Sequence, residues 1–405
     1  MIVDDRDDAD TNACVACGEV DLQTVYVPRN SPRGLTVKMC RACAFVQSWP
    51  RIDHAPGQQK SLTADGGWGN IRYGKGFRTR DHLSLLGHRM ADQKPTRLLD
   101  VGSSRGSFIL GARELWPDCD IVAVEPDQSV TSAYDMRQDI RFIGQRIEQV
   151  GFDRESFDLI YSCHTLEHLA DPVRVLEDHR AWLRPGGLLL LEVPNFAHLH
   201  AEDIVEEWFI DKHLNHYTEE SLLRQLDKAG FEVVMMPRKS DRANLTILAR
   251  PREGHQNPPM AWAPAQEISD TEQTIYAYTD RIYANRALLA SVSDRIVRMP
   301  ANRIAIWGAG RIFHALVQYG GLPVEHLGLI IDSQLSTLGL ACYGRAIDAP
   351  SSLATGGIDT VIVASRLFAK EIEAEALRHN RHLQIIFFQD LMDDARENSR
   401  LAATA

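Results

Sequence analysis

The sequence has no long apolar run, few aromatic residues and no cluster of basic ones. No stretch among its 405 residues is apolar for long enough to span a bilayer. The net charge of -11 and the absence of a Lys/Arg run argue against a general nucleic-acid-binding protein, because such proteins neutralise phosphates with clustered basic residues. The first residues, MIVDDRDDAD, do not resemble a signal peptide. We therefore expect a cytoplasmic protein with no membrane or nucleic-acid partner.

Cysteine is also scarce, and most of it is concentrated near the amino terminus. Four of the 7 cysteines form two C-x-x-C pairs. Four thiolates supply the closed tetrahedral shell that a structural zinc ion prefers, and a small segment with little apolar core needs such a staple. Two redox-active C-x-x-C sites are the alternative, but neither pair lies at a strand–helix junction. We expect structural zinc on Cys14, Cys17, Cys40 and Cys43.

A glycine-containing loop follows an apolar strand in the segment LLDVGSSRGSF, residues 98–108. Gly102 and Gly106 permit positive φ angles and let a ligand lie against bare backbone at the carboxyl end of a parallel sheet. The next strand, IVAVE, ends at Glu125, where a carboxylate can accept both hydroxyls of a ribose. The loop reads GSSRG and lacks the G-x-G-x-x-G pattern that approaches a pyrophosphate. The pattern therefore favours a cofactor with ribose and adenine but no phosphate.

Two further segments follow at the intervals expected of successive strand–helix units, FDLIYSCHTLEH and LRPGGLLLLEVPN. The combination resembles class I S-adenosylmethionine-dependent methyltransferases, whose usual first motif is D-x-G-x-G-x-G, with Ser104 here in place of the middle glycine. The resemblance implies S-adenosylmethionine as the cofactor. The candidate contacts are Asp100, Gly102, Ser103, Gly106, Glu125, Pro126, Ile147, Ser162 and His164.

Strand patterns that alternate with helical ones predict an α/β protein with a Rossmann-like methyltransferase core. Amphipathic patterns predict helices over 81–91 and 268–297. We expect a zinc-binding module over 1–58, a connector and helix over 59–95, the methyltransferase domain over 96–250, a linker and long helix over 251–300, and a second Rossmann-like α/β domain over 301–405.

The carboxy-terminal domain contains a second strand–turn–helix pattern. RIAIWGAGRIFHAL, residues 303–316, includes a G-A-G turn, and the next strand ends at Asp332. This arrangement is typical of a nucleotide-sized half-site. A single G-x-G is common, however, and Asp332 can equally cap the end of a strand. We expect this domain to bind a ligand.

Methyl transfer is an in-line displacement at a sulfonium, so the protein must position an acceptor and remove its proton. Histidine suits proton removal near neutral pH. Two segments supply candidate bases: CHTLEH, with His164, and WFIDKHLNHYT, with His213, His216 and Tyr217. Glu167 and His168 lie just beyond His164, and for these two residues a structural role is at least as well supported as a role as the base. Packing or capping roles are the alternative for the second segment too.

The order of zinc module, methyltransferase core and second Rossmann-like domain is similar to that of sugar C-methyltransferases acting on nucleotide-linked keto-deoxysugars. In that family the last domain helps to receive the nucleotide, and a His-Glu-His-x-Ser-Tyr-Phe-Thr segment supplies the base. DKHLNHYT keeps the second histidine as His213 and the threonine as Thr218. The replacements are Asp211 for histidine, Lys212 for glutamate, Asn215 for serine and His216 for tyrosine.

These replacements leave the acceptor atom open, because enolate formation needs a base and stabilisation of the developing oxyanion. Lys212 is a candidate for that stabilisation. We expect C-methylation of a nucleotide-linked sugar, with O-methylation of a sugar or glycan hydroxyl as the alternative. A non-catalytic protein that binds cofactor and nucleotide sugar is a further alternative. A nucleic-acid methyltransferase would need a basic face, which the acidic composition does not predict.

Overall fold

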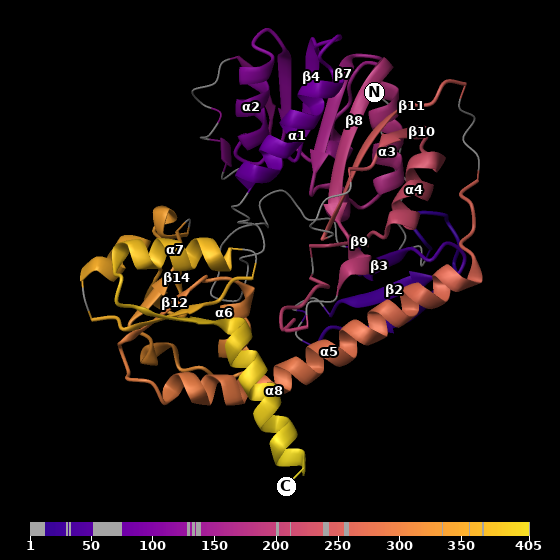
Figure 1. The fold of residues 1–405 in the computed structure, drawn as a ribbon. Coiled ribbons are helices and arrows are strands. Elements are labelled where there is room, and N and C mark those ends of the chain that lie inside the picture. Colours follow the sequence, from indigo (N-terminus) through magenta and orange to yellow (C-terminus); the bar gives the residue numbers. More distant parts are fainter. Residues whose placement is uncertain are drawn as a thin grey trace. The chain divides into compact units, whose positions relative to one another are not determined.

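A computed structural model gives the fold of two compact units (Figure 1). Among the described residues, the first unit comprises those within 13–51, 75–199 and 208–276, and the second comprises those within 202–207 and 277–404. The structure describes residues 13–29, 31, 34–51, 75–127, 130, 131, 134, 139–199, 202–210, 212–237, 243–254, 259–333, 335–355, 357–366 and 368–404. Most of the predicted connector, residues 59–74, and part of the predicted linker, residues 255–258, lie outside this description.

A seven-stranded sheet forms the core of the first unit, with strand order β10-β11-β8-β7-β4-β5-β6. The strands from β8 to β6 run parallel, whereas β11 pairs antiparallel with both β8 and β10. This arrangement confirms the predicted α/β fold class. The strands are β4 Arg97–Val101, β5 Asp120–Val124, β6 Ile140–Ile143, β7 Phe157–Cys163, β8 Leu183–Pro194, β10 Phe231–Met235 and β11 Asn244–Pro251.

Both faces of this sheet are covered by helices, which explains why its strands are apolar at successive positions. Leu98 and Leu190 share one hydrophobic cluster with the helices α1 and α2. Their chain neighbours Leu99 and Leu191 face the other way and share a cluster with α3 and α4 (Figure 1). The helices are α1 Lys75–Arg89, α2 Ser107–Leu115, α3 Pro172–Trp182 and α4 Glu219–Lys228.

Local capping signals account for where the helices α3 and α4 begin. Asp171 caps α3, its side chain accepting a hydrogen bond from the backbone of Arg174. Thr218 and Ser221 form a reciprocal capping box at the start of α4. The first helix begins at Lys75, earlier than the predicted start at Asp81. The prediction began later because the first turn of this helix carries no apolar repeat.

The cysteine pairs belong to a small four-stranded sheet of order β1-β2-β3-β9. Three of its strands come from the amino-terminal segment, and the fourth comes from the loop before α4. Val46 pairs with His216 across β3 and β9. The cysteine module is therefore packed into the same unit as the large sheet. Its strands are β1 Leu22–Tyr26, β2 Thr36–Cys40, β3 Val46–Trp49 and β9 Asn215–His216.

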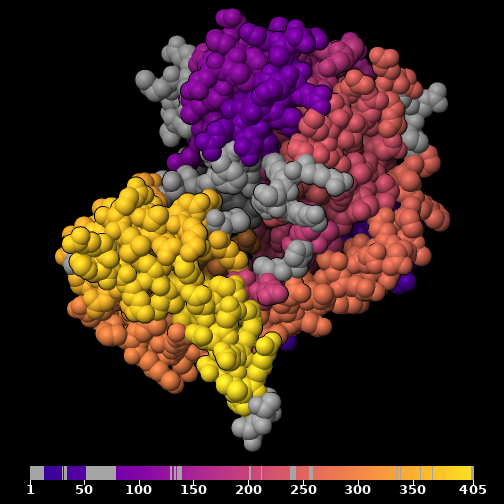
Figure 2. Space-filling view, viewed as in Figure 1, coloured from indigo at the N-terminus to yellow at the C-terminus, as the bar shows by residue number. Residues whose placement is uncertain are grey.

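The second unit contains a parallel four-stranded sheet of order β13-β12-β16-β17. Its helix α8 lies at the surface of this unit, coloured yellow in Figure 2. The elements are β12 Ile304–Trp307, α6 Arg311–Gln318, β13 Leu329–Ile331, β14 Ala341–Cys342, β15 Arg345–Ala346, β16 Thr360–Val363, α7 Ala369–His379, β17 Gln384–Phe387 and α8 Phe388–Thr404. This unit also contains the short 3-10 helices η6 Val324–His326, η7 Leu335–Leu338 and η8 Pro350–Thr355. Those of the first unit are η3 Ile147–Gln149, η4 Leu166–His168 and η5 Phe196–His198.

The long helix α5, Ala265–Val297, contributes to both units. It begins at Ala265, close to the predicted start at Ile268, and it ends at the predicted residue. Within the described part of the chain, no helix combines the length and the apolar character needed to cross a membrane.

An acidic segment between η5 and β9, residues 202–207, belongs to the second unit. Val205 is fully buried in the hydrophobic core of that unit. The side-chain amide of Asn285, on α5, donates to the carbonyls of Glu202 and Ile204 at 2.8 and 2.9 Å. Arg366 pairs with Asp203 at 2.6 Å. The chain therefore contributes to the second unit before it returns to the first at β9.

Candidate active site

The loop after β4 adopts the left-handed backbone that its glycines favour. Gly102 has φ 73 and Gly106 has φ 75, and Ser104 between them has φ 49. A Cβ atom on Gly102 would lie 2.1 Å from Oγ1 of Thr165, so a larger residue would have to displace Thr165 and would also strain the backbone. Ser104 occupies an uncommon conformation for a residue with a side chain.

The Glu125 carboxylate lies against this loop, at the end of β5. Its Oε2 accepts a hydrogen bond from the backbone N–H of Ser104 at 2.8 Å, and its Oε1 accepts one from Asp127 at 2.9 Å. The residue is only 9% exposed. These two backbone donors fix the orientation of the carboxylate and connect it to Ser104, which stabilises the loop in its strained conformation.

The remaining candidate cofactor residues lie on neighbouring strands or in buried positions. Asp100 and Ser162 lie near the carboxyl ends of the paired strands β4 and β7. Pro126 directly follows Glu125, and Ile147 is buried in η3. The Ser103 hydroxyl accepts a hydrogen bond from the Tyr134 hydroxyl at 2.8 Å. Sequence reasoning missed Tyr134, whose polar surroundings gave no signal.

His164 begins the turn after β7, in the left-handed conformation with φ 54. Its Nδ1 lies 3.1 Å from Oε1 of Glu167, and its Nε2 lies 3.6 Å from Oε1 of Glu192. Its backbone N–H donates to the Glu192 carbonyl at 2.8 Å. The imidazole is therefore held between two buried carboxylates.

Glu167, His168 and His213 form one cluster, although His213 comes from a distant part of the sequence. Nε2 of His168 lies 3.8 Å from Oε1 of Glu167, and the ring centroids of His168 and His213 are 5.0 Å apart. Glu167 is 1% exposed and His213 is 8% exposed. The structure thus brings the predicted base His213 beside Glu167 and His168, for which the sequence supports a structural role at least as well as a catalytic one.

The protonation state of the cluster follows from its surroundings. Nδ1 of His168 lies 2.8 Å from the Lys212 carbonyl, which can only accept, so this nitrogen carries the proton. Burial lowers the pKa of His168 below its usual value, which favours the neutral ring. Burial alone would raise the pKa of Glu167, but hydrogen bonding from His164, the charge interactions with His168 and His164, and a backbone hydrogen bond together outweigh burial and lower that pKa. Glu167 is therefore ionised at neutral pH.

Arg51 and Asn215 hold the turn that carries Glu167 and His168. Nη2 of Arg51 donates to the Ala170 carbonyl at 2.9 Å and to the side chain of Asn215 at 2.8 Å. Asn215 in turn donates to the Leu169 carbonyl at 2.8 Å. The cysteine module, through Arg51, thus helps to position the candidate catalytic turn.

His216 and Tyr217 are packed in the interior. Nε2 of His216 lies 2.8 Å from the Ser48 hydroxyl, and burial lowers the pKa of this histidine to about 3. Tyr217 is fully buried, and its ring packs against Phe45 with centroids 5.5 Å apart. These contacts correspond to the packing alternative for this segment. Asp211 lies outside the described residues.

A buried polar network that sequence reasoning missed lies next to His164. Nε2 of His82 on α1 lies 3.0 Å from Oε2 of Glu192 on β8, and its Nδ1 lies 3.0 Å from the Tyr161 hydroxyl on β7. The Thr246 hydroxyl donates to the same Glu192 oxygen at 2.5 Å. A glutamate within the apolar run LLLLEV was the available signal, because a charge in a buried strand needs partners.

The four predicted cysteine ligands come together in the small sheet. The Sγ atoms of Cys14 and Cys43 are 3.6 Å apart, as are those of Cys17 and Cys40, and all four lie within 4.8 Å of one another. None of them forms a disulfide. Zn–S bonds of about 2.3 Å in a tetrahedron place sulfur atoms about 3.8 Å apart. The donor set and its spacing fit zinc.

The predicted half-site of the second unit is occupied by contacts within that unit. A Cβ atom on Gly308 would lie 2.8 Å from the Ala364 carbonyl oxygen, so this glycine permits close packing of two strand ends. Asp332 accepts a hydrogen bond from the backbone of Leu335 at 3.0 Å, which caps η7. Arg311, at the start of α6, donates to the Glu207 carbonyl at 3.2 Å.

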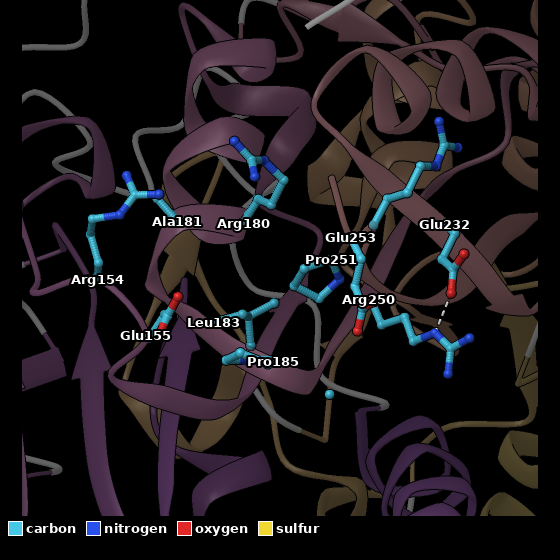
Figure 3. A pocket seen from close by; sticks show the side chains of 12 residues that line it. Arg154, Glu155, Arg180, Ala181, Leu183, Pro185, Glu232, Arg250, Pro251 and Glu253 are labelled. Atoms are coloured by element: carbon cyan, nitrogen blue, oxygen red, sulfur yellow. Dashed lines mark hydrogen bonds and ion pairs between the residues drawn. The ribbon is translucent and has the colours of Figure 1, made fainter. Parts of the chain in front are cut away.

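One cavity of the first unit, about 580 Å³ in volume, lies at the amino ends of the parallel strands (Figure 3). Leu183, at the start of β8, and Glu155, just before β7, line it. Arginines and glutamates both line it, and Arg250 pairs with Glu232. The loop after β4 and Glu125 lie at the opposite, carboxyl ends of the strands, so this cavity is separate from the candidate active site.

Comparisons with known proteins agree with this geometry. Residues 76–235 match a family described as a methyltransferase domain. Methyltransferase str3 of Strobilurus tenacellus is 32% identical over 118 residues, which cover 28% of this chain and 42% of that protein. Ubiquinone biosynthesis O-methyltransferase of Parvibaculum lavamentivorans is 30% identical over 29% of this chain and 48% of that protein.

Among solved structures, an S-adenosylmethionine-dependent methyltransferase from Mesorhizobium loti is similar at 16% identity and a TM-score of 0.33, covering 38% of this chain and 90% of that one. The sheet, its glycine loop and the family match define the class: the chain contains a class I S-adenosylmethionine-dependent methyltransferase domain. The chain spans less than half the length of each of these two curated relatives.

Proposed function

We propose that the protein is an S-adenosylmethionine-dependent methyltransferase. The observation that carries the proposal is the Glu125 carboxylate, held by two backbone donors beside the Gly102–Gly106 loop at the carboxyl edge of the sheet. When bound, the cofactor supplies an electrophilic methyl group on a sulfonium. Glu125 would accept the ribose hydroxyls, and the bare backbone at Gly102 would allow the cofactor to approach the sheet.

The acceptor we propose is the carbon beside the ketone of a nucleotide-linked keto-deoxysugar. The order of the three parts and the retained His213 and Thr218 support this substrate class. His213 would remove the proton from that carbon, and the electron pair left behind would form the new bond to the methyl group. The electrons of the broken carbon–sulfur bond remain on sulfur. Glu167 and His168, next to His213, would stabilise the positive charge that this histidine gains.

One observation favours O-methylation as the second candidate. Asn215, which stands where the C-methyltransferase pattern has serine, donates both to Leu166 and to Leu169 carbonyls, at 3.1 and 2.8 Å. Because the side-chain amide of Asn215 donates to these two carbonyls, it holds η4 in place and is not available to an acceptor ketone. Transfer to a hydroxyl requires only one base, which His213 alone would supply.

The test is mass spectrometry of the protein with S-adenosylmethionine and a panel of nucleotide-linked keto-deoxysugars and their hydroxyl counterparts, in deuterated water. We expect a methylated keto sugar with deuterium exchanged into the carbon beside its ketone. A methylated hydroxyl sugar without exchange would support O-methylation instead. Tight cofactor binding without any product from either set would contradict catalysis and favour a binding protein.

A further inference from the structure

We infer that Glu167, His168 and His213 bind a divalent transition-metal cation at the candidate active site. The inference refines the proposed methyl transfer and rests on it for the role of the cation, although not for the site itself. Two imidazoles and one carboxylate are a common ligand set for such metals when further positions remain open for substrate.

The spacing of the three side chains suits a shared ion. One ligand atom of each lies within 4.8 Å of the other two, and Oε1 of Glu167 lies 3.8 Å from Nε2 of His168. A metal bound at about 2.0–2.2 Å from each ligand places neighbouring ligand atoms roughly 3–4 Å apart.

The charges of the cluster favour a cation. Oε2 of Glu167 is buried and has no hydrogen-bond partner among the residues that the structure describes. Nδ1 of His168 carries its proton toward the Lys212 carbonyl, so Nε2 presents a lone pair to the Glu167 carboxylate. Two acceptors that face each other without a proton repel, and a metal ion between them removes that repulsion.

The surrounding contacts are those expected of ligand-orienting partners. The Lys212 carbonyl fixes the tautomer of His168 at 2.8 Å, and His164 approaches Glu167 at 3.1 Å. Metal-bound imidazoles and carboxylates usually have such partners, which hold the ligand atoms in place. The cluster is also open on one side, because the His168 side chain is 32% exposed. Water or an acceptor oxygen can therefore reach the ion.

The cation would supply what the altered DKHLNHYT segment lacks. An acceptor ketone or hydroxyl oxygen bound to the ion would have its developing negative charge stabilised. His213 would then be a ligand and not the base, and the ion would supply a bound hydroxide that could take the acceptor proton and become water. The acceptor anion takes the methyl group as before. The proposed substrate class is accordingly narrowed to acceptors with an oxygen at, or next to, the methylated atom.

The test is a titration of the full chain, with its cysteine cluster zinc-loaded, with Mn²⁺ followed by electron paramagnetic resonance. Mn²⁺ prefers nitrogen and oxygen ligands to thiolates, so it will not report on the cysteine cluster. We expect a single tight Mn²⁺ in the wild type and an affinity loss of about 100-fold or more in both Glu167→Gln and His213→Ala. The matched control is His88→Ala, an exposed histidine on α1, which should bind Mn²⁺ like the wild type.

S-adenosylmethionine affinity of each variant, measured in parallel, separates loss of the metal site from loss of the fold, because Glu125 and its loop are untouched. Absence of Mn²⁺ binding in the wild type, or equal binding by Glu167→Gln and His213→Ala, would overturn the inference and leave His213 as the proposed base. Mn²⁺ binding that depends on Glu167 and His213, with no methylated product from any acceptor, would support the site and contradict the proposed function.

Discussion

At the scale of single residues, the candidate site is built from carboxylates whose partners fix both their charge and their direction. Glu125 is held by backbone donors, whereas Glu167 lies between two histidines. Both are nearly inaccessible to water, which strengthens their interaction with a bound group. Replacing either one therefore removes a specific interaction and also leaves its partners unsatisfied.

Glu125→Ala is expected to weaken S-adenosylmethionine binding by at least 10-fold. A hydrogen bond to a charged group is worth about 1.5–3 kcal/mol, and this carboxylate also stabilises the loop at Ser104. Isothermal titration calorimetry measures the affinity. The control is Asp120→Ala, at the other end of the same strand, which should bind the cofactor normally. Equal affinity in Glu125→Ala and the wild type would refute the ribose assignment.

At the scale of elements, short segments from distant parts of the chain complete structures that no continuous stretch forms alone. Strand β9 pairs with β3 and joins the cysteine module to the large sheet. Residues 202–207 contribute buried and charged contacts to the second unit. Both segments lie between β8 and α4, the part of the chain that also carries His213.

Cys14→Ser is expected to abolish zinc binding and to destabilise the small sheet, because three thiolates leave the tetrahedral shell open. Elemental analysis of the purified protein gives the zinc content, and thermal unfolding gives the stability. Cys119→Ser is the matched control, since Cys119 is a buried free cysteine of the same unit outside the cluster. Wild-type protein that contains no zinc would contradict the assignment.

Asp203→Asn is expected to lower the free energy of unfolding of the second unit by about 1–3 kcal/mol. It removes the charge that pairs with Arg366 in a largely buried position, and the partial exposure of Arg366 reduces the loss below that of a fully buried pair. Chemical denaturation measures the change. Glu373→Gln breaks the exposed pair with Lys370 on α7 and should cost less than about 1 kcal/mol. A similar loss in both variants would show that the burial of Asp203 has no special effect.

At the scale of the whole molecule, neutral histidines in the interior connect stability to pH. Burial lowers the pKa of His179 to about 3 and that of His216 to about 3. The unfolded chain has a histidine pKa of about 6.5, so it binds protons that the folded chain does not in the interval between these values. The stability of the first unit should therefore fall as the pH decreases from about 6.5 toward 3.

His179→Leu is expected to reduce this loss of stability by about 1.4 kcal/mol per pH unit, the contribution of one proton. Neither ring nitrogen of His179 has a hydrogen-bond partner among the residues described, so leucine of similar volume costs little at neutral pH. Urea denaturation at several pH values between 6.5 and 4.5 measures the slope. His88→Leu, at an exposed position, should keep the wild-type slope. An unchanged slope in His179→Leu would show that this histidine titrates normally in the folded chain.

Local patterns were enough to predict the fold class and the strand core. The runs that became β4, β5 and β7 depend on apolar periodicity and turn chemistry within a few residues. The strand β8 begins earlier than its apolar run, at Leu183, because a register shift in β7 lets this residue pair with Phe157. Such pairing depends on another strand, and the sequence of β8 alone does not contain it.

The sequence by itself determined the methyltransferase core, its glycine loop with Glu125, and the four cysteines that the fold brings together. Only the tertiary structure decided which loop residues face one another. It placed His213 beside Glu167 and His168, and it packed His216 and Tyr217 into the interior. The physical reason is that glycine conformation and apolar periodicity are local properties, whereas the partner of a buried charge is chosen by contacts between segments far apart in the chain.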